Sequence, residues 1–267
     1  MHAPARPALA WKPIALPAEH GGWGMLAEPV VLGLVLAPSA AGGCLALAAL
    51  LGFLARHPLR LWLLDLRKGV RYPRTALAER FFVGYAGLAA LLLALASAQA
   101  AAPFWPALAA AAPLGVVALV FDARGRSREA LPELSGAVAL GASAVAIALA
   151  GAAPAGVAWG ASALLALRAI TCVLYVRARI RLDRGLPARP RAVVAGHAAA
   201  LAACVGLAQY TWVPWLAAAA FLVLLARAAW GLSPLRHPVR PKVLGFQELG
   251  YGLLTLALLV VGYRLGP

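Results

Sequence analysis

Long apolar stretches, broken by charged residues, prolines and glycines, recur along the whole chain. A membrane-spanning helix needs about 20 mainly apolar residues, and fewer where its end residues reach the interface. The pattern predicts nine spans, near 24–38, 40–56, 81–98, 104–121, 133–151, 155–177, 191–209, 213–231 and 244–263. We therefore expect an all-α, polytopic bundle, with a cytoplasmic N-terminal segment over 1–22 and one transmembrane domain over 23–267.

The connections between the predicted spans alternate in charge. Every second connection lacks charged residues, and these turns lie near Pro38, Ala102, Ala153 and Thr211. The other connections carry most of the Lys and Arg, and they cover 56–80, 122–133, 177–191 and 236–242. Because Lys and Arg favour the cytoplasmic side, this alternation predicts a multi-pass protein of the bacterial inner (cytoplasmic) membrane, with its N-terminus inside and its C-terminus outside.

The connection after the second predicted span is amphipathic. Over 59–66, leucines and Trp62 surround Arg60 and Asp65. One interpretation is that the second helix runs on past the membrane and lies across the mouth of the bundle. The alternative is an interfacial anchor made by Trp and Arg.

Composition supports a membrane protein and excludes a soluble domain. The 267 residues are 63% hydrophobic and 12% charged, whereas a soluble domain has about 25% charged residues. The net charge of +15 would suggest nucleic acid in a soluble protein, but here the basic residues lie in short loops, so we expect no nucleic-acid partner. The sequence lacks phosphate-loop, zinc-protease and haem-attachment motifs, and we expect neither a metal nor an organic cofactor.

A few ionisable residues interrupt the predicted spans. Such a residue costs on the order of 2.5–3.5 kcal/mol on insertion scales, so each is a functional candidate. They are Glu28, Arg168, His197 and Glu248 within spans, Glu133 at the start of one and Arg227 near the end of another. Arg168 lies nine residues before Arg177, where the basic run begins, which is roughly 13 Å along a helix. Its charge therefore needs an anion or a buried carboxylate inside the bundle, and Glu28 or Glu248 could instead be structural partners for it.

Further candidates lie near the predicted membrane entries. Glu19 and His20 precede a glycine-rich segment. Together with Asp65 they are the candidate acid–base (catalytic) residues. The alternative for Glu19 and His20 is a helix cap with a Trp anchor.

Arg168, Arg177 and Arg181 have roughly helical spacing and could converge on a phosphate or carboxylate. The last two could also be topology signals that contact anionic lipid. The full set of candidate ligand-binding residues is Glu28, Arg56, His57, Arg71, Arg74, Glu133, Arg168, Tyr175, Arg177, Arg181, Arg236, His237, Lys242 and Glu248.

These motifs resemble those of the YwiC-like family of bacterial membrane proteins. The resemblance rests on segment 19–25 (Glu-His-Gly-Gly-Trp-Gly-Met) with Pro29, on His57-Pro58, on 133–136, on 168–185, and on 240–242 with Gly245 and Glu248. More distantly, the layout is similar to the UbiA prenyltransferase superfamily, in which cytoplasmic loops after helices 2, 4 and 6 cap a polar cavity. Where that superfamily has Asp-rich motifs, this chain keeps only Asp65 and Asp183.

The UbiA-like layout implies an isoprenoid or other lipid anion as the small-molecule partner, with its head group held by arginines in a cytoplasmic-side cavity. Transferase chemistry of the UbiA type would follow from the same layout. One alternative is a small-anion transporter in which Glu28 or Glu248 takes up a proton. The other is a membrane assembly factor without its own chemistry.

Overall fold

The computed structural model describes residues 10–17 and 20–266 of the chain, and every regular element in this range is a helix. A short helix precedes nine long ones. In chain order they are α1 (Lys12–Ala15), α2 (His20–Leu36), α3 (Ala40–Arg67), α4 (Pro73–Gln99), α5 (Trp105–Ala123), α6 (Ala130–Ala150), α7 (Ala155–Asp183), α8 (Pro190–Gln209), α9 (Leu216–Gly231) and α10 (Pro241–Leu265).

The predicted all-α polytopic bundle is confirmed, and each predicted span falls on one of the helices α2–α10. Seven of these helices are long and apolar enough to cross a membrane. The other two, α2 with 17 residues and α9 with 16, are shorter. At 1.5 Å per residue each is about 25 Å long, slightly less than the roughly 30 Å of a hydrocarbon core.

The second span continues beyond the apolar segment that defines it. Helix α3 runs without interruption from Ala40 to Arg67, through Pro58. The helix therefore continues over 59–66, and its position past the membrane and across the mouth of the bundle stays a prediction. Asp65, near its end, is fully buried, whereas Leu66 beside it is exposed. The extension therefore packs one face against the protein.

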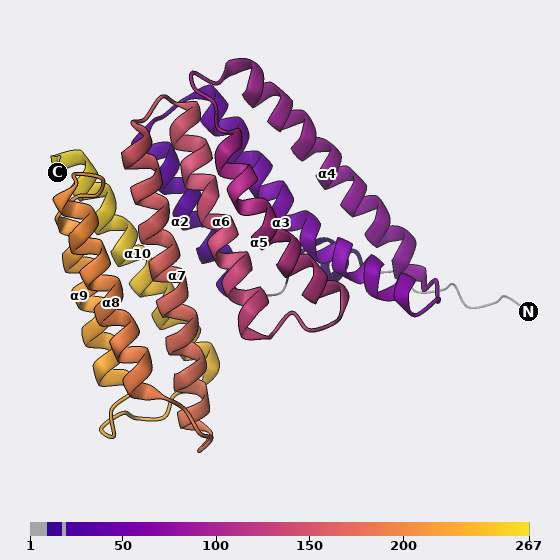
Figure 1. Cartoon of the computed structure of the whole chain (residues 1–267). Coiled ribbons are helices and arrows are strands. Elements are labelled where there is room, and N and C mark those ends of the chain that lie inside the picture. Colours follow the sequence, from indigo (N-terminus) through magenta and orange to yellow (C-terminus); the bar gives the residue numbers. More distant parts are fainter. Residues whose placement is uncertain (1–9, 18–19, 267) are drawn as a thin grey trace, which may run out of the picture.

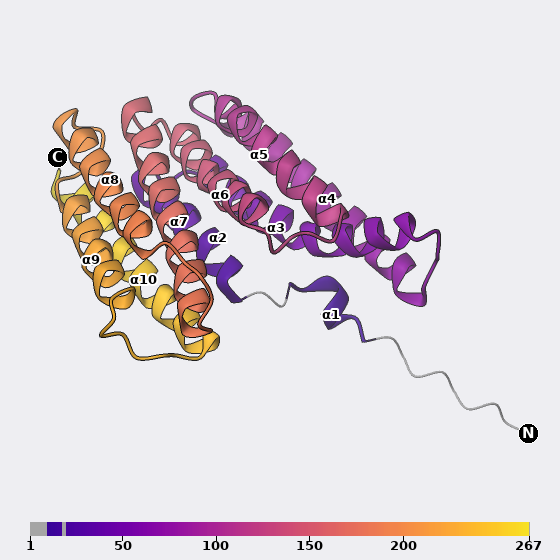
Figure 2. The same ribbon diagram turned by 60° about the horizontal axis from the view of Figure 1, so that its bottom comes forward.

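Helix α6 lies in the middle of the bundle and packs against α2, α3, α5 and α7 (Figure 1). Helices α6 and α7 are the most buried spans, and α4 on the outer edge is the least buried. A glycine permits the close approach of α2 to α6, because a Cβ on Gly33 would lie 2.8 Å from the Cβ of Ile147. Helices α8, α9 and α10 cover the other side of α7 and α2, and α1 packs against α3 and α4 (Figure 2).

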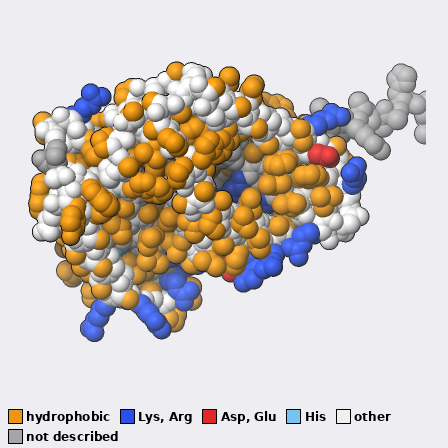
Figure 3. Space-filling model, turned by 45° about the horizontal axis from the view of Figure 1, so that its top comes forward, with side chains coloured by type: hydrophobic (Ala, Val, Ile, Leu, Met, Phe, Trp, Pro, Cys, Tyr) orange, Lys and Arg blue, Asp and Glu red, His pale blue; other side chains and the backbone are white. Residues whose placement is uncertain are grey.

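Consecutive long helices run in opposite directions, so the connections gather at two ends (Figure 1). The uncharged turns between α2 and α3, α4 and α5, α6 and α7, and α8 and α9 share one end. The basic connections share the other, which we call the basic end. Figure 3 shows Lys and Arg side chains along the lower edge of a largely hydrophobic surface, and a hollow with a basic side chain at its floor.

The first prediction concerns orientation in the membrane. We expect the basic end to face the cytoplasm, because Lys and Arg are retained there. Cysteines introduced at Ala101 and Leu186, in turns at opposite ends, should react with an impermeant thiol reagent from outside and from inside, respectively. The unsubstituted protein, with Cys44, Cys172 and Cys204, gives the background. Labelling of both sites from the same side would contradict the antiparallel arrangement.

Candidate functional site: a buried charge cluster and a basic groove

Five ionisable side chains meet inside the bundle, and we call them the buried charge cluster. Each comes from a different helix, and they are Glu28 (α2), Arg168 (α7), His197 (α8), Arg227 (α9) and Glu248 (α10). All five are at least nine-tenths buried. The surrounding helix faces are apolar, so each charge depends on the others for compensation.

The first ion pair joins α2 to α7. Arg168 Nη1 lies 2.9 Å from Glu28 Oε2, and both side chains are buried. Arg168 Nη2 also donates to the backbone carbonyl of Glu248 at 3.4 Å. Gly252, one turn beyond Glu248 on α10, makes room for this pair, because a Cβ there would lie 2.5 Å from Arg168 Nη2. The predicted contact of Arg168 with a buried carboxylate is confirmed.

The second ion pair joins α9 to α10. Arg227 Nη1 donates to Glu248 Oε2, which also accepts a hydrogen bond from the Cys172 thiol at 3.2 Å. The Arg227 guanidinium lies over the ring of Tyr175 at 4.0 Å and over that of Tyr251 at 5.3 Å. Cation–π contacts of this kind strengthen when water is excluded, so Arg227 is held on several sides.

His197 is held in one neutral form by its two partners. Its Nδ1 lies 2.9 Å from the carbonyl of Val193, and its Nε2 lies 3.0 Å from Arg227 Nη2. An arginine only donates hydrogen bonds, so Nε2 accepts and the ring proton is on Nδ1. The cluster thus contains two arginines, two carboxylates and a neutral imidazole, and its formal charge is zero.

Three atoms of the buried charge cluster have no hydrogen-bond partner. They are Nε of Arg168, Nε of Arg227 and Oε1 of Glu248. A buried polar atom left without a partner costs about 1–3 kcal/mol. The ion pairs therefore balance the charge of the cluster without satisfying all its hydrogen-bonding capacity.

At the basic end, most predicted arginines also pair with carboxylates. Arg56 binds Asp122 through two nitrogens, at 2.6 and 3.1 Å. Arg177 donates to Glu133 at 2.8 Å. These contacts fasten α3 to α5 and α6 to α7.

Asp65 and Arg74 tie the end of α3 to the start of α4. The buried Asp65 accepts hydrogen bonds from Arg74 Nη2 and from the Thr75 hydroxyl, both at 2.8 Å. A carboxylate with these partners is held ionised, and its oxygens are engaged.

Hydrogen bonds to Asp183, which we call the Asp183 lock, join the end of α7 to the connection before α10. Asp183 accepts from Arg179 at 3.0 Å, from Arg236 at 3.3 Å and from the backbone N–H of Val239 at 3.3 Å. The buried Arg179 also donates to the carbonyls of Gly231 and His237. This connection is therefore held in one arrangement.

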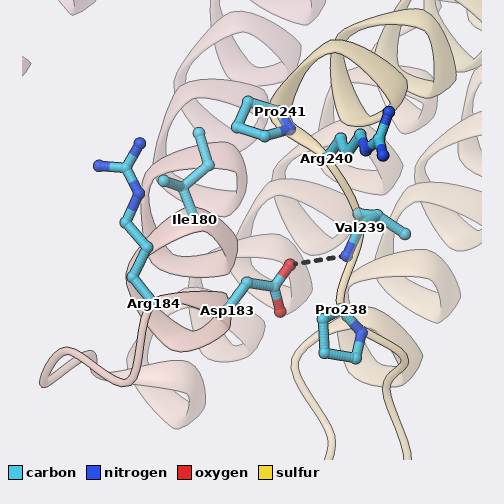
Figure 4. Close-up of a pocket in the computed structure, with 7 residues that line it drawn as sticks. All are labelled: Ile180, Asp183, Arg184, Pro238, Val239, Arg240 and Pro241. Carbon is cyan, nitrogen blue, oxygen red and sulfur yellow. Dashed lines mark hydrogen bonds between the residues drawn. The ribbon is translucent and has the colours of Figure 1, made fainter.

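Beside this lock lies a groove of about 320 Å³, which we call the basic groove. Its lining residues are Ile180, Asp183, Arg184, Pro238, Val239, Arg240 and Pro241. Figure 4 shows Arg184 on the α7 side and Arg240 at the start of α10, with apolar side chains between them. Both arginines are exposed.

The structure does not bring Arg168, Arg177 and Arg181 together on one ligand. Arg168 pairs with Glu28, Arg177 with Glu133, and Arg181 donates to the carbonyl of Pro187 at 2.7 Å. The reason is that a carboxylate or carbonyl lies within reach of each guanidinium. Helical spacing places them along α7, but the neighbouring helices decide their partners.

The remaining predicted residues are dispersed. His57 contacts the Pro13 carbonyl at 3.0 Å, and Arg71, His237 and Lys242 are exposed. Glu19 lies outside the described residues, and His20 begins α2 but its side chain is not described. The acid–base role expected for Glu19, His20 and Asp65 stays a prediction.

Among the residues that belong to the cluster or contact it, the predicted binding set included Tyr175 but not Arg227, Cys172 or Tyr251. Arg227 had a sequence signal, because it interrupts an apolar span. Cys172 and Tyr175 follow Arg168 at helical spacing, which places them on the same face of α7. Tyr251 had no signal that distinguishes it from an interfacial aromatic. Within the described residues, no three His, Cys, Asp or Glu side chains are grouped to hold a metal ion.

The fold and the charge cluster define a polytopic α-helical membrane protein with ion pairs inside its bundle. The family model described as YwiC-like protein matches residues 16–148, about half of the chain. The chain therefore belongs to the YwiC-like family. Among the five residues of the cluster, Glu28 lies within the matched range. Comparisons with curated proteins and with solved structures found no match.

The second prediction concerns the Glu28–Arg168 pair. Arg168→Ala should lower the free energy of unfolding by about 3–5 kcal/mol, because a buried carboxylate is left without its partner. The paired variant Arg168→Ala with Glu28→Ala should recover part of this loss. Arg126→Ala breaks an exposed ion pair with Glu129 and should change stability by less than about 1 kcal/mol. Denaturant unfolding in detergent measures all three; no recovery in the paired variant would contradict the ion pair.

The third prediction concerns the glycine beneath this pair. Gly252→Ala should destabilise the fold by about 1–3 kcal/mol, because the added methyl group meets Glu28 and Arg168. Gly250→Ala is the matched control, since a Cβ there has no neighbour within 4 Å. Thermal unfolding in detergent compares the two variants. Equal stability would show that the ion pair does not depend on the space left by the missing side chain of Gly252.

Proposed function

We propose that the protein binds an amphipathic anion of lipid or isoprenoid type, with the anionic head group in the basic groove. The observation that carries the proposal is the groove itself, with Arg184 and Arg240 at its two sides and apolar residues between them. Arginine binds phosphate and carboxylate through two parallel hydrogen bonds. The groove thus offers both the charge and the apolar surface that such a ligand needs.

Electrostatics favour an anion at this position. Four arginines, Arg179, Arg184, Arg236 and Arg240, lie around the single carboxylate of Asp183. The surplus is three positive charges. Asp183 already accepts three hydrogen bonds, two of them from arginines. These donors offset its negative charge, which weakens its repulsion of an anionic ligand. The N-terminus of α10, which begins at Pro241, adds a partial positive charge.

The groove is also held rigid before any ligand binds. The Asp183 hydrogen bonds fix both the end of α7 and the backbone at Val239. A site that is already ordered loses less conformational entropy on binding. Ile180, Val239 and the two prolines then provide apolar contacts for the first carbons of a chain.

Binding is the part of a UbiA-type function that this geometry supports. The acidic residues retained from the Asp-rich motifs, Asp65 and Asp183, both accept hydrogen bonds from arginines. Both carboxylates are therefore engaged in the described structure. We accordingly propose a lipid-anion-binding protein whose arginines neutralise the head group directly.

The fourth prediction tests the groove. The variant with Arg184→Gln and Arg240→Gln should bind farnesyl phosphate at least about tenfold more weakly, because each lost charge-assisted hydrogen bond contributes about 1.5–3 kcal/mol. Arg264→Gln removes an arginine near the C-terminal end of α10 and should leave affinity unchanged. Tryptophan fluorescence titration of the purified protein measures the affinities. Equal binding by the groove variant and the unsubstituted protein would contradict the proposal.

Two further titrations separate the possible forms of the ligand. Inorganic phosphate should bind more weakly than farnesyl phosphate if the apolar contacts contribute, and equally if only the charge is recognised. Farnesyl phosphate binding should survive EDTA, since the arginines supply the positive charge. Loss of binding with EDTA and its return with Mg²⁺ would show that a metal, rather than the arginines, holds the head group.

A further inference from the structure

The buried charge cluster lies deeper in the bundle than the basic groove and takes no part in the function proposed there. We propose that this cluster is a second binding site, which takes up one small monovalent oxyanion together with one proton on Glu248. The protein would then be a proton-linked carrier of such anions, in addition to binding an amphiphile at its basic end.

The first support is that two buried donors of the cluster have no hydrogen-bond acceptor. Arg168 uses Nη1 and Nη2 on Glu28 and on the Glu248 carbonyl, and Arg227 uses its two terminal nitrogens on Glu248 and His197. The Nε–H of each arginine has no partner and is buried. Two buried donors without acceptors are what an oxyanion satisfies.

The second support is charge balance. The cluster has two arginines and two carboxylates and is neutral, so an anion entering alone would leave one uncompensated negative charge in an apolar interior. Such a charge is strongly disfavoured. One proton taken up with the anion restores neutrality. The cluster is therefore suited to binding the anion and the proton together, and to binding neither of them alone.

Glu248 is the group that the contacts favour for this proton. Its Oε1 is buried and unpartnered, while its Oε2 accepts from Arg227 and Cys172. A proton from solvent can form an O–H bond at Oε1 without displacing either hydrogen bond. The new O–H can then donate to the bound anion.

The other groups that face Glu248 are less suitable. From α8, His197 already accepts from Arg227 at Nε2, and a proton there would set two positive groups against each other. From α2, Glu28 is paired with Arg168. The remaining ionisable neighbours are neutral donors or aromatic faces, and they are Cys172 and Tyr175 from α7 and Tyr251 from α10.

Nitrate is the probe that tests this inference, with dihydrogen phosphate as a second monovalent oxyanion. Calorimetric titration of the purified protein in two buffers of different ionisation enthalpy gives both the affinity and the number of protons taken up. We expect one proton per nitrate bound. In proteoliposomes, an inward nitrate gradient should acidify the interior.

Variants identify the groups involved. Glu248→Gln should abolish proton uptake, whereas Glu129→Gln, which removes a carboxylate of an exposed ion pair, should not change it. Arg227→Lys should weaken nitrate binding at least about tenfold, because lysine lacks the planar fork. If Glu248→Gln does not fold, infrared absorption of the unsubstituted protein should gain a carboxylic acid C=O band when nitrate is added.

Three results would overturn the inference: no binding of either anion by folded protein, binding without proton uptake, or proton uptake unchanged in Glu248→Gln. The groove variant, Arg184→Gln with Arg240→Gln, should take up nitrate and a proton normally. Loss of farnesyl phosphate binding alone would therefore leave this inference standing, and loss of nitrate binding alone would leave the groove proposal standing.

Discussion

The pairing of charges inside an apolar bundle is the constraint on which the rest of the structure depends. A charged side chain is expensive to place in an apolar interior, yet Glu28, Arg168, Arg227 and Glu248 are all buried inside the bundle. They are tolerated because each faces an opposite charge on another helix. The pairs join α2 to α7 and α9 to α10, and Arg168 reaches the backbone of α10. The cluster therefore sets which helices can be neighbours at this depth and how each is rotated.

Helix periodicity carries this constraint along α7. Arg168, Cys172, Tyr175 and Arg179 follow one face at helical spacing. The first three contribute to the buried charge cluster, and Arg179 contributes to the Asp183 lock. Tyr175 also packs closely on Gly231, whose carbonyl accepts from Arg179. A single helix face thus connects the buried charge cluster in the middle of the bundle with the hydrogen bonds of Asp183 beside the basic groove.

Features that depend on the local sequence could be predicted, and those that depend on helix order could not. Apolar segment length and loop charge predicted the nine long helices and the two ends of the bundle, because both are properties of consecutive residues. The depth of Arg168 predicted that it needs an internal partner. Which carboxylate it takes depends on which helices are adjacent, and neither Glu28 nor Glu248 was favoured by sequence. The same limit explains why Arg177 and Arg181, placed near Arg168 by spacing, contact Glu133 and the Pro187 carbonyl instead.

The most direct measurement of the central constraint is the energetic coupling between the two buried ion pairs. Unfolding free energies of Glu28→Gln, Glu248→Gln and the double variant would be compared with those of the unsubstituted protein in the same detergent. If the cluster acts as one unit, the two effects should deviate from additivity by roughly 0.5–3 kcal/mol, as for residues in one network. Effects that add within about 0.3–0.5 kcal/mol, as independent sites do, would contradict a single buried charge cluster.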